Sequence, residues 1–334
     1  MHSSSNNSAT STSSTALDVG PFRLLEPLAS GGMGVVWSAT PRDGSGLPDV
    51  AIKLLRADRA TDESQLEGFL RETQITASLC HPNIVQTLDS GVLPPGDWPE
   101  PLAAGCPWLA MKQAPGGTLV DIAGRLPWSE ARRMLLELLD ALAYVHDAGL
   151  LHLDIKPGNV LIGADGESIL ADFGLARSIT ATGTLSAQNW GTAAYMAPEQ
   201  LAEEPERVGP ATDLYAFGCV AWSLLSGRPP FGRAPEEAAV QHLYSPVPNL
   251  ASSHPVPREI EVWLRRLLAK APGERFEDAR AAAIALLALG DAPLDSAGGR
   301  GDRRHVGGEP TTRKLHGPPP LLRPASEPRK RVLR

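Results

Sequence analysis

Four polar residues in the middle of the chain have the types and spacing needed to transfer a phosphoryl group. Asp154, Lys156 and Asn159 lie within one short run, residues 151–161, and Asp172 follows two positions before a glycine. A carboxylate can accept or orient the proton of a hydroxyl nucleophile, and an ammonium group can stand beside the transferred phosphate. Asn159 and Asp172 supply oxygen ligands of the kind that magnesium prefers. One aspartate alone would be explained more simply as a turn or cap, but the whole set predicts a catalytic site.

A glycine-rich segment and a strand that ends in lysine precede these residues. Residues 28–36 read LASGGMGVV, and glycines allow backbone amides to approach phosphate oxygens closely. Such a turn is often only structural, but here the run Val-Ala-Ile-Lys follows at residues 50–53. Its apolar residues would bury the stem of Lys53, whereas most lysines lie at the surface. The two segments together predict a phosphate-binding site.

The first part of the chain has the pattern of a small β-rich unit with one helix. Short β-type runs at residues 35–39 and 50–54 are separated by a turn rich in Pro, Gly and Asp. Apolar residues recur with helical spacing over residues 63–79. Residues 89–106 are rich in Pro and Gly and are expected to form a long loop, and residues 108–114 are expected to form a strand.

From residue 119 onward the pattern is helical. Ser129 is expected to cap a helix in which apolar residues between 134 and 145 form a stripe. Four more helices are expected at residues 211–226, 235–243, 258–270 and 277–289. The sequence therefore predicts an α+β fold, in which a small β-rich lobe with one main helix precedes a larger, mainly helical lobe.

These features together resemble the serine/threonine protein kinases, in particular the bacterial eukaryote-like (Hanks-type) group. The resemblance covers residues 22–289. It rests on the catalytic run 151–161, Ala-Asp-Phe-Gly at 171–174, the glycine-rich segment 28–36, Val-Ala-Ile-Lys at 50–53, His-Pro-Asn-Ile-Val at 81–85 and GTAAYMAPEQ at 191–200. It implies a bilobal protein-kinase-like fold, with an N-lobe and hinge at residues 19–117 and a C-lobe at residues 118–290. It also implies ATP as the phosphoryl donor and Mg²⁺ as the metal, with Mn²⁺ as the alternative.

The resemblance assigns Lys53 to the α- and β-phosphates of ATP. In the family this lysine is held by an ion pair with an acidic residue of the helix that follows. Glu72 fits that partner best, and Glu63 and Glu67 are the other candidates in the same helix.

The resemblance also implies an adenine pocket at the hinge between the lobes. Met111 would guard the rear of this pocket, and the backbone of Lys112 and Ala114 would meet adenine. Apolar side chains would sandwich the ring. The complete set of implied ATP-binding residues is Leu28, Ala29, Gly31, Gly32, Gly34, Val36, Ala51, Lys53, Glu72, Met111, Lys112, Ala114 and Leu161.

Residues 191–199 bear on the substrate class. They resemble the end of a kinase activation segment, which phosphotransferases that act on small molecules lack. By this resemblance Thr192, together with Lys156, points to Ser or Thr acceptors in protein substrates, including the chain itself, rather than to Tyr. Thr192 is therefore expected to be a substrate-binding residue.

Two further acidic residues have scaffold roles by the same resemblance. Glu199 should form a buried ion pair with Arg275. Asp213, which opens one of the predicted helices, should hold the backbone of the catalytic run.

Two positions depart from the family pattern. Ala29 stands where the first of three glycines would fall, and Leu153 stands where most members carry an arginine. These departures leave open a pseudokinase, which would act as a nucleotide-binding or scaffold module. Neither position binds metal or transfers a proton, and Lys53 and the four polar residues described first all remain, so we favour an active kinase. A kinase of small molecules is a third alternative, which residues 191–199 disfavour.

Composition is typical of a globular cytoplasmic protein. The chain has 334 residues, 42% of them hydrophobic, and no apolar run approaches the roughly 20 residues that would span a bilayer. Residues 1–15 lack the basic-then-apolar pattern of a secretory signal. Cys80, Cys106 and Cys219 are widely separated, without the spacing of a metal site. We therefore expect reduced thiols, a cytoplasmic location and no membrane span.

The two ends of the chain differ from the rest in composition. Residues 1–18 are rich in Ser, Thr and Asn and are expected to be disordered. Residues 291–334 carry ten Lys and Arg against five Asp and Glu, interleaved with Pro and Gly, and are expected to form a disordered basic tail. A partner-binding or nucleic-acid-binding arm is the alternative for this tail, but it contains no aromatic residue, so no nucleic-acid partner is expected. The oligomeric state stays open.

Overall fold

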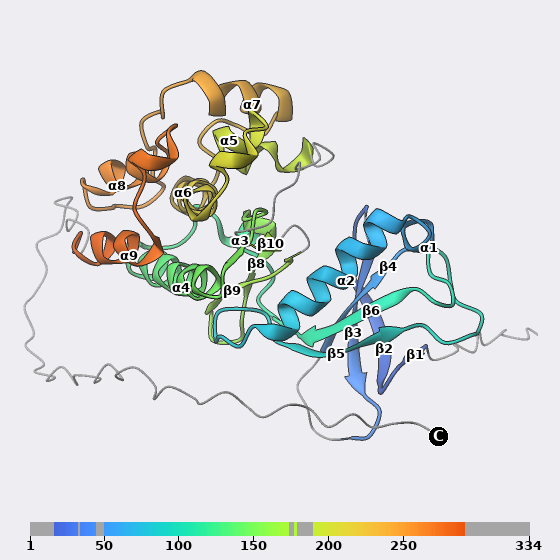
Figure 1. Ribbon diagram of the computed structural model, residues 1–334. Coiled ribbons are helices and arrows are strands. Elements are labelled where there is room, and N and C mark those ends of the chain that lie inside the picture. Colours follow the sequence, from blue (N-terminus) through green and yellow to red (C-terminus); the bar gives the residue numbers. More distant parts are fainter. Residues whose placement is uncertain (1–16, 33, 45–49, 174–176, 179–189, 291–334) are drawn as a thin grey trace, which may run out of the picture. The chain divides into compact units, whose positions relative to one another are not determined.

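The computed structural model describes residues 17–32, 34–44, 50–173, 177–178 and 190–290 (Figure 1). For residues 177–178 and 190–192 it describes the backbone alone. Strands predominate in the first of two lobes and helices in the second, which is the predicted fold class.

The first lobe is built on one antiparallel sheet with the strand order β1-β2-β3-β4-β6-β5. Its strands are β1 (Asp18–Val19), β2 (Phe22–Ser30), β3 (Gly34–Pro41), β4 (Val50–Leu55), β5 (Thr87–Val92) and β6 (Pro107–Lys112). Side chains alternate along β4, so that Val50, Ile52 and Leu54 are fully buried on one face. Ala51 and Lys53 consequently share the opposite face.

One long helix, α2 (Glu63–Ser78), packs against this sheet (Figure 1). It begins after Asp62, whose carboxylate accepts hydrogen bonds from two backbone amides of the first turn. Phe69 of α2 packs with Leu55 and Leu109 of the sheet in a small buried cluster. This contact fixes which face of the helix is turned toward the strands.

The second lobe consists mainly of helices. The remaining helices of the described chain are α1 (Ala57–Ala60) in the first lobe and α3 (Leu119–Ile122), α4 (Trp128–Asp147), α5 (Pro198–Leu201), α6 (Pro210–Ser226), α7 (Pro235–Tyr244), α8 (Ile260–Leu267) and α9 (Ala279–Leu287) in the second. Short 3-10 turns are η1 (Pro157–Asn159), η2 (Trp190–Tyr195), η3 (Pro205–Arg207) and η4 (Pro272–Glu274). Two small sheets pair β7 (Leu150–Leu151) with β10 (Arg177–Ser178), and β8 (Val160–Ile162) with β9 (Ser168–Leu170).

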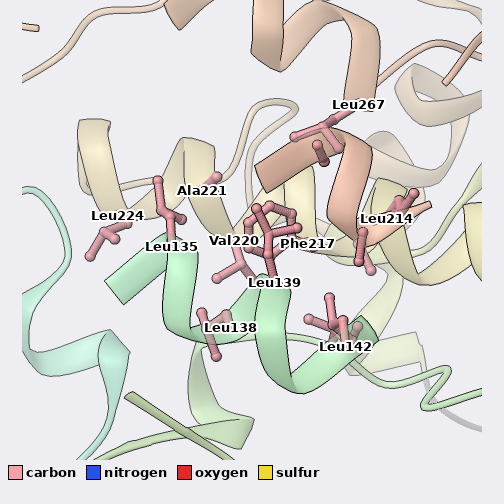
Figure 2. Close-up of a cluster of buried hydrophobic side chains, with 14 of the residues drawn as sticks. Leu135, Leu138, Leu139, Leu142, Leu214, Phe217, Val220, Ala221, Leu224 and Leu267 are labelled. Carbon is pink, nitrogen blue, oxygen red and sulfur yellow. The ribbon is translucent and has the colours of Figure 1, made fainter. Parts of the chain in front are cut away.

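Helices α4 and α6 form the centre of the second lobe (Figure 2). Leu139 of α4 lies beside Phe217 and Val220 of α6, and all three are fully buried. Gly218 allows α8 to approach α6, because a Cβ atom there would lie 2.9 Å from the Cβ of Leu267. Burial of one such leucine contributes about 1.5–3 kcal/mol to the free energy of folding. The packed cluster therefore stabilises the helices that hold the catalytic run, which follows α4.

The predicted strands and long helices are confirmed, but two details of local structure are wrong. Ser129 does not cap the helix: α4 begins at Trp128, after Pro127, and no side chain caps it. The predicted loop 89–106 is too long, because its first residues pair with β6 and extend β5 to Val92. In the second case the hydrogen bonds of the ladder outweigh the loop-like local composition.

Strand β1 begins at Asp18, the last residue of the segment 1–18 that the composition predicts to be disordered. Asp18 pairs with Arg23 across the strands and forms ion pairs with the side chains of Arg23 and Arg42. Residues 1–16 and the basic tail 291–334 lie outside the described residues.

The three cysteines are free thiols, with Cys106 and Cys219 buried and Cys80 exposed. Burial raises the pKa of Cys219 well above its ordinary value, so this thiol is protonated at neutral pH. Among the helices that the structure describes, none has both the length and the apolar composition of a bilayer-spanning segment.

Candidate active site

A cavity of about 460 Å³ is lined by residues of both lobes. Ten of the implied ATP-binding residues line it, namely Leu28, Ala29, Val36, Ala51, Lys53, Glu72, Met111, Lys112, Ala114 and Leu161. Asn159 and Asp172 line it as well, so the nucleotide and metal residues predicted from widely separated segments meet in one place.

The cavity also has lining residues that the sequence did not single out. They are Val85, Gln113, Pro115, Gly117, Thr118, Gly158 and Ala171. Most are next to a predicted site residue along the chain, so adjacency would have identified them. Val85 belongs to the quoted run His-Pro-Asn-Ile-Val, but no pattern in the sequence indicates that its side chain faces this cavity.

The glycine-rich segment forms the turn between β2 and β3, and its glycines do not line the cavity. The amide of Gly31 donates a hydrogen bond to the carbonyl of Gly34 at 2.9 Å and closes the turn. A Cβ atom at Gly34 would lie 2.3 Å from the carbonyl oxygen of Leu54, whereas one at Gly31 or Gly32 would meet nothing within 4 Å. Gly34 is therefore required by the close approach of β3 to β4.

Lys53 joins three parts of the site. Its ammonium nitrogen donates hydrogen bonds to both carboxylate oxygens of Glu72, at 2.7 and 2.8 Å, and to Oδ1 of Asp172 at 3.1 Å. The ion pair with Glu72 is the predicted one, and the rivals Glu63 and Glu67 lie exposed on α2. Burial alone would lower the pKa of Lys53, but Asp172 and Glu72 outweigh it and raise that pKa, so the lysine is charged.

Asp172 lies in the loop after β9 with a left-handed backbone, φ 63°. A residue other than glycine adopts this conformation at a cost of about 1–3 kcal/mol, and such strain is concentrated at functional sites. Burial would raise the pKa of Asp172, but the charge and hydrogen bond of Lys53 outweigh it and lower that pKa. The carboxylate is therefore ionised, as a metal ligand must be.

The catalytic run holds Asp154 in one orientation. Oδ2 of Asp154 accepts hydrogen bonds from Nζ of Lys156 at 2.7 Å and from Nδ2 of Asn159 at 2.9 Å. The same amide nitrogen of Asn159 also donates to the backbone oxygen of Asp154 at 2.8 Å. Oδ1 of Asp154 is buried and has no hydrogen-bond partner within the described part of the chain. One oxygen is thus fixed by the protein while the other is left to accept a proton.

Asp213, at the start of α6, holds the backbone of the catalytic run, as predicted. Its carboxylate accepts hydrogen bonds from the backbone amides of His152 at 2.9 Å and Leu153 at 2.8 Å, and from the ring of His146 at 2.9 Å. Leu153 has a left-handed backbone, φ 64°. Burial would raise the pKa of Asp213, but the hydrogen bond from His146, the neighbouring histidine charges and the backbone amide outweigh it and lower that pKa.

The predicted pair of Glu199 and Arg275 is also present. Two hydrogen bonds, at 2.7 and 2.8 Å, join the guanidinium and the carboxylate, and both side chains are fully buried. Thr212 donates to the same carboxylate at 2.8 Å, so the pair ties α5 to the start of α6. The backbone of Thr192 lies in η2, and its side chain lies outside the described residues.

The donor set fits magnesium. Since Nδ2 of Asn159 is committed to Asp154, its Oδ1 is the atom left for a cation, and the ionised Asp172 supplies a second oxygen. No group of three or more His, Cys, Asp or Glu side chains that could hold a metal occurs in the part of the chain that the structure describes. Two protein ligands suffice for Mg²⁺, which usually keeps several waters and binds substrate phosphates.

Comparison with known proteins agrees with this geometry. Residues 22–284 match the family model described as protein kinase domain. The serine/threonine-protein kinase PknB of Mycobacterium leprae is 36% identical over 265 residues, which is 77% of this chain and 41% of that protein. The probable serine/threonine-protein kinase CE0033 of Corynebacterium efficiens is 33% identical over 322 residues, 91% of this chain and 47% of that protein. The probable serine/threonine-protein kinase PknB of Bifidobacterium longum is 39% identical over 240 residues, 69% of this chain and 34% of that protein. The matched regions thus span less than half the length of these curated relatives.

Proposed function

Since this chain belongs to the protein kinase family, we propose that it is an ATP-dependent serine/threonine protein kinase. It transfers the γ-phosphate of ATP to serine and threonine hydroxyls of proteins, its own included. The names of the similar proteins support this acceptor class. The proposal concerns the kinase domain, which we take as residues 19–290.

The observation that carries the proposal is the unpartnered Oδ1 oxygen of Asp154. Lys156 and Asn159 hold the other oxygen, so Oδ1 is oriented to accept the proton of a substrate hydroxyl. The hydroxyl oxygen then forms a bond to the γ-phosphorus, the bond from that phosphorus to the bridging oxygen breaks, and ADP leaves. Because Lys156 lies beside Asp154, its ammonium group would also lie beside the phosphoryl group during transfer and would neutralise part of its negative charge.

Lys53 is proposed to bind the α- and β-phosphates of ATP. Phosphate oxygens would replace Asp172 as a partner of Lys53, while Glu72 would continue to hold the ammonium group in position. Asp172 would then be released toward the metal. Asn159 and Asp172 are proposed to hold Mg²⁺, or Mn²⁺ in its place, and the metal would neutralise the phosphate charge.

The adenine ring is proposed to lie between Val36 and Ala51 on one side and Leu161 on the other, with Met111 at the rear. Backbone groups of Lys112 and Ala114 would bind the edge of the ring. The cavity lining supports this arrangement, since all of these residues contribute to it. Gly31, Gly32 and Gly34 would close over the phosphates from the turn above.

Thr192 is proposed to contribute to the acceptor side of the site, where serine and threonine side chains of protein substrates enter. We further propose a cytoplasmic location and no nucleic-acid partner, which composition supports. The pseudokinase alternative has little support, because Ala29 and Leu153 supply neither a metal ligand nor a proton acceptor.

The decisive experiment measures phosphoryl transfer from ATP with magnesium to the protein itself and to a library of Ser/Thr peptides. Asp154→Asn keeps the size of the side chain but removes the proton acceptor. We expect it to lower the initial rate by at least about a hundredfold, or about 2.7 kcal/mol, while circular dichroism and thermal melting stay near those of the wild type. Full activity in this variant would contradict the proposal.

A further inference from the structure

A second cavity, of about 220 Å³, borders the catalytic run. Lys156 lines it, and Gly158 lines both this cavity and the proposed nucleotide cavity. Because Lys156 also bonds to Asp154, this second cavity adjoins the place where a substrate hydroxyl would meet Asp154.

The charges that line this cavity are all positive. Three cationic residues, Lys156, Arg228 and Arg233, contribute to it, and no Asp or Glu is among its lining residues within the described chain. Lys156 is already paired with Asp154. Arg228 and Arg233 are exposed and form no ion pair with any residue that the structure describes. Two guanidinium groups without a carboxylate, beside the place of transfer, indicate an anionic ligand.

The fold fixes Arg228 at the end of α6. Gly227 ends that helix in the left-handed conformation, φ 79°. The amide of Gly124 donates to the carbonyl of Leu224 at 2.8 Å, and a Cβ at Gly124 would lie 2.8 Å from the Cα of Gly227. This close backbone contact holds the end of α3 against the end of α6, so the wall that carries Arg228 is rigid.

Arg233 is fixed by the anchored loop between α6 and α7. Phe231 is buried, with its ring centroid 4.8 Å from that of His242 and 4.3 Å from the ammonium nitrogen of Lys270. Arg233 follows two residues later. Tyr195 of η2 lines the same cavity as Arg233.

A third, outer cavity, of about 370 Å³, shares Arg228 and Arg233 with the second, but none of its lining residues in the described chain comes from the catalytic run. Glu237, on α7, lines only this outer cavity, together with polar groups such as Gln241 and Asn249. The two arginines therefore line both cavities. In the second cavity, beside the catalytic run, all charged lining residues of the described chain are positive, whereas the outer cavity also has Glu237. An anionic side chain of a peptide that enters the second cavity would therefore meet these arginines, which line it together with Lys156.

We propose that Arg228 and Arg233 bind the carboxylate or phosphate group of a protein substrate next to its Ser or Thr acceptor. The inference rests on the proposed function and adds the substrate class: segments that are acidic or already phosphorylated. The two arginines select the substrate and take no part in the transfer step.

The test uses the full chain and peptides that carry one Thr acceptor. Glu is placed at each flanking position in turn, with Gln at the same position as the matched neutral peptide, and a second arm compares phosphoserine with serine. We expect kcat/KM to be at least about tenfold higher for the best acidic peptide than for its Gln partner, which corresponds to about 1.4 kcal/mol. The phosphoserine arm shows whether carboxylate or phosphate is preferred.

The ratio of acidic to neutral kcat/KM should fall toward one in Arg228→Gln and Arg233→Gln, and Arg233→Glu should favour a Lys peptide instead. Arg258→Gln, an exposed arginine before α8, should keep the wild-type ratio. An equal ratio in the wild type and both Gln variants would overturn the proposal. Binding of the labelled acidic and neutral peptides, followed by fluorescence polarisation, tests the arginines separately from catalysis. Loss of all transfer with retained, arginine-dependent acidic binding would count against the proposed function and not against this inference.

Discussion

The ammonium nitrogen of Lys53 lies 3.1 Å from Oδ1 of Asp172. Lys53 belongs to β4 and Asp172 to the loop after β9, so this contact joins the two lobes across the proposed nucleotide cavity. Glu72 of α2 holds the same ammonium group. One cation therefore stabilises two carboxylates, and removal of any member changes the charge balance of the other two.

The first prediction concerns this cluster. Asp172→Asn should abolish phosphoryl transfer and should also remove the effect of magnesium on ATP binding, because it removes the only negatively charged one of the two proposed metal ligands. Thermal melting with ATP, with and without magnesium, provides the measurement: the wild type should gain stability when magnesium is added and the variant should not. Lys53→Met should abolish transfer too and lower the free energy of unfolding by about 3–5 kcal/mol, since it leaves the buried carboxylate of Glu72 without its cation. Undiminished activity in Asp172→Asn would refute the metal assignment.

The second prediction concerns the glycine-rich turn. Gly34→Ala should lower the free energy of unfolding by about 1–3 kcal/mol, because the added methyl group would overlap the carbonyl oxygen of Leu54 and push β3 from β4. The apparent KM for ATP should rise as well. Ala29→Gly is the matched change in the same segment and should alter the apparent affinity for ATP by no more than about 1 kcal/mol. If Ala29→Gly converted an inert protein into an active one, the pseudokinase interpretation would be correct.

The third prediction concerns the pH dependence of stability at Asp213. The folded-state pKa of this carboxyl lies below its ordinary value of 3.8. The ionised group therefore stabilises the fold above about pH 4, and this contribution is lost as the pH falls through the lower folded-state pKa. Asp213→Asn, which cannot ionise, should cost about 3 kcal/mol at pH 7, the value of charge-assisted hydrogen bonds to buried donors. The difference between wild type and variant, measured by denaturant unfolding, should shrink below pH 4. A difference that stays constant down to pH 3 would contradict the assignment.

The resemblance predicted two ion pairs between separate segments, Lys53 with Glu72 and Glu199 with Arg275, but it did not indicate the contact between Lys53 and Asp172. Glu72 was preferred over Glu63 and Glu67 by resemblance, and the physical reason appears only in the fold, where α2 turns the rivals toward solvent. The contact between Lys53 and Asp172 joins residues 119 positions apart and has no signature in either segment.

Local composition was misleading where tertiary contacts decide the backbone. Residues 89–92 have the composition of a loop, but they form a strand because β6 offers them hydrogen-bond partners. Arg228 and Arg233 lie in a loop without periodicity, and they reach the cavity beside Lys156 through tertiary contacts: the close approach of the ends of α3 and α6, and the burial of Phe231. Resemblance could not indicate this pair, because the motifs that carried it do not include the loop.

The last prediction concerns Leu153. In most protein kinases, by the resemblance described above, an arginine at this position is neutralised by a phosphate on the activation segment, which orders the loop. Leu153 is instead an apolar side chain, 4% exposed, and only its backbone is held, by Asp213 and Gln200. A phosphate on the segment would therefore find no cation at this position.

We expect that phosphorylation of Ser178, Thr180, Thr182, Thr184 or Ser186, whose side chains lie outside the described residues, is not the main switch for activity. The initial rate should change by less than about tenfold after complete phosphatase treatment, and the same should hold when the three threonines are replaced by alanine. A fall of about a hundredfold, or about 2.7 kcal/mol, would show that another basic residue, Arg71 or Arg177, receives the phosphate.

Leu153→Arg gives the converse test. Because it buries a charge at a site that holds a leucine side chain, this variant should have a free energy of unfolding lower by several kcal/mol. Phosphorylation of the activation segment should restore part of that loss. Melting curves recorded before and after phosphatase treatment would measure both effects.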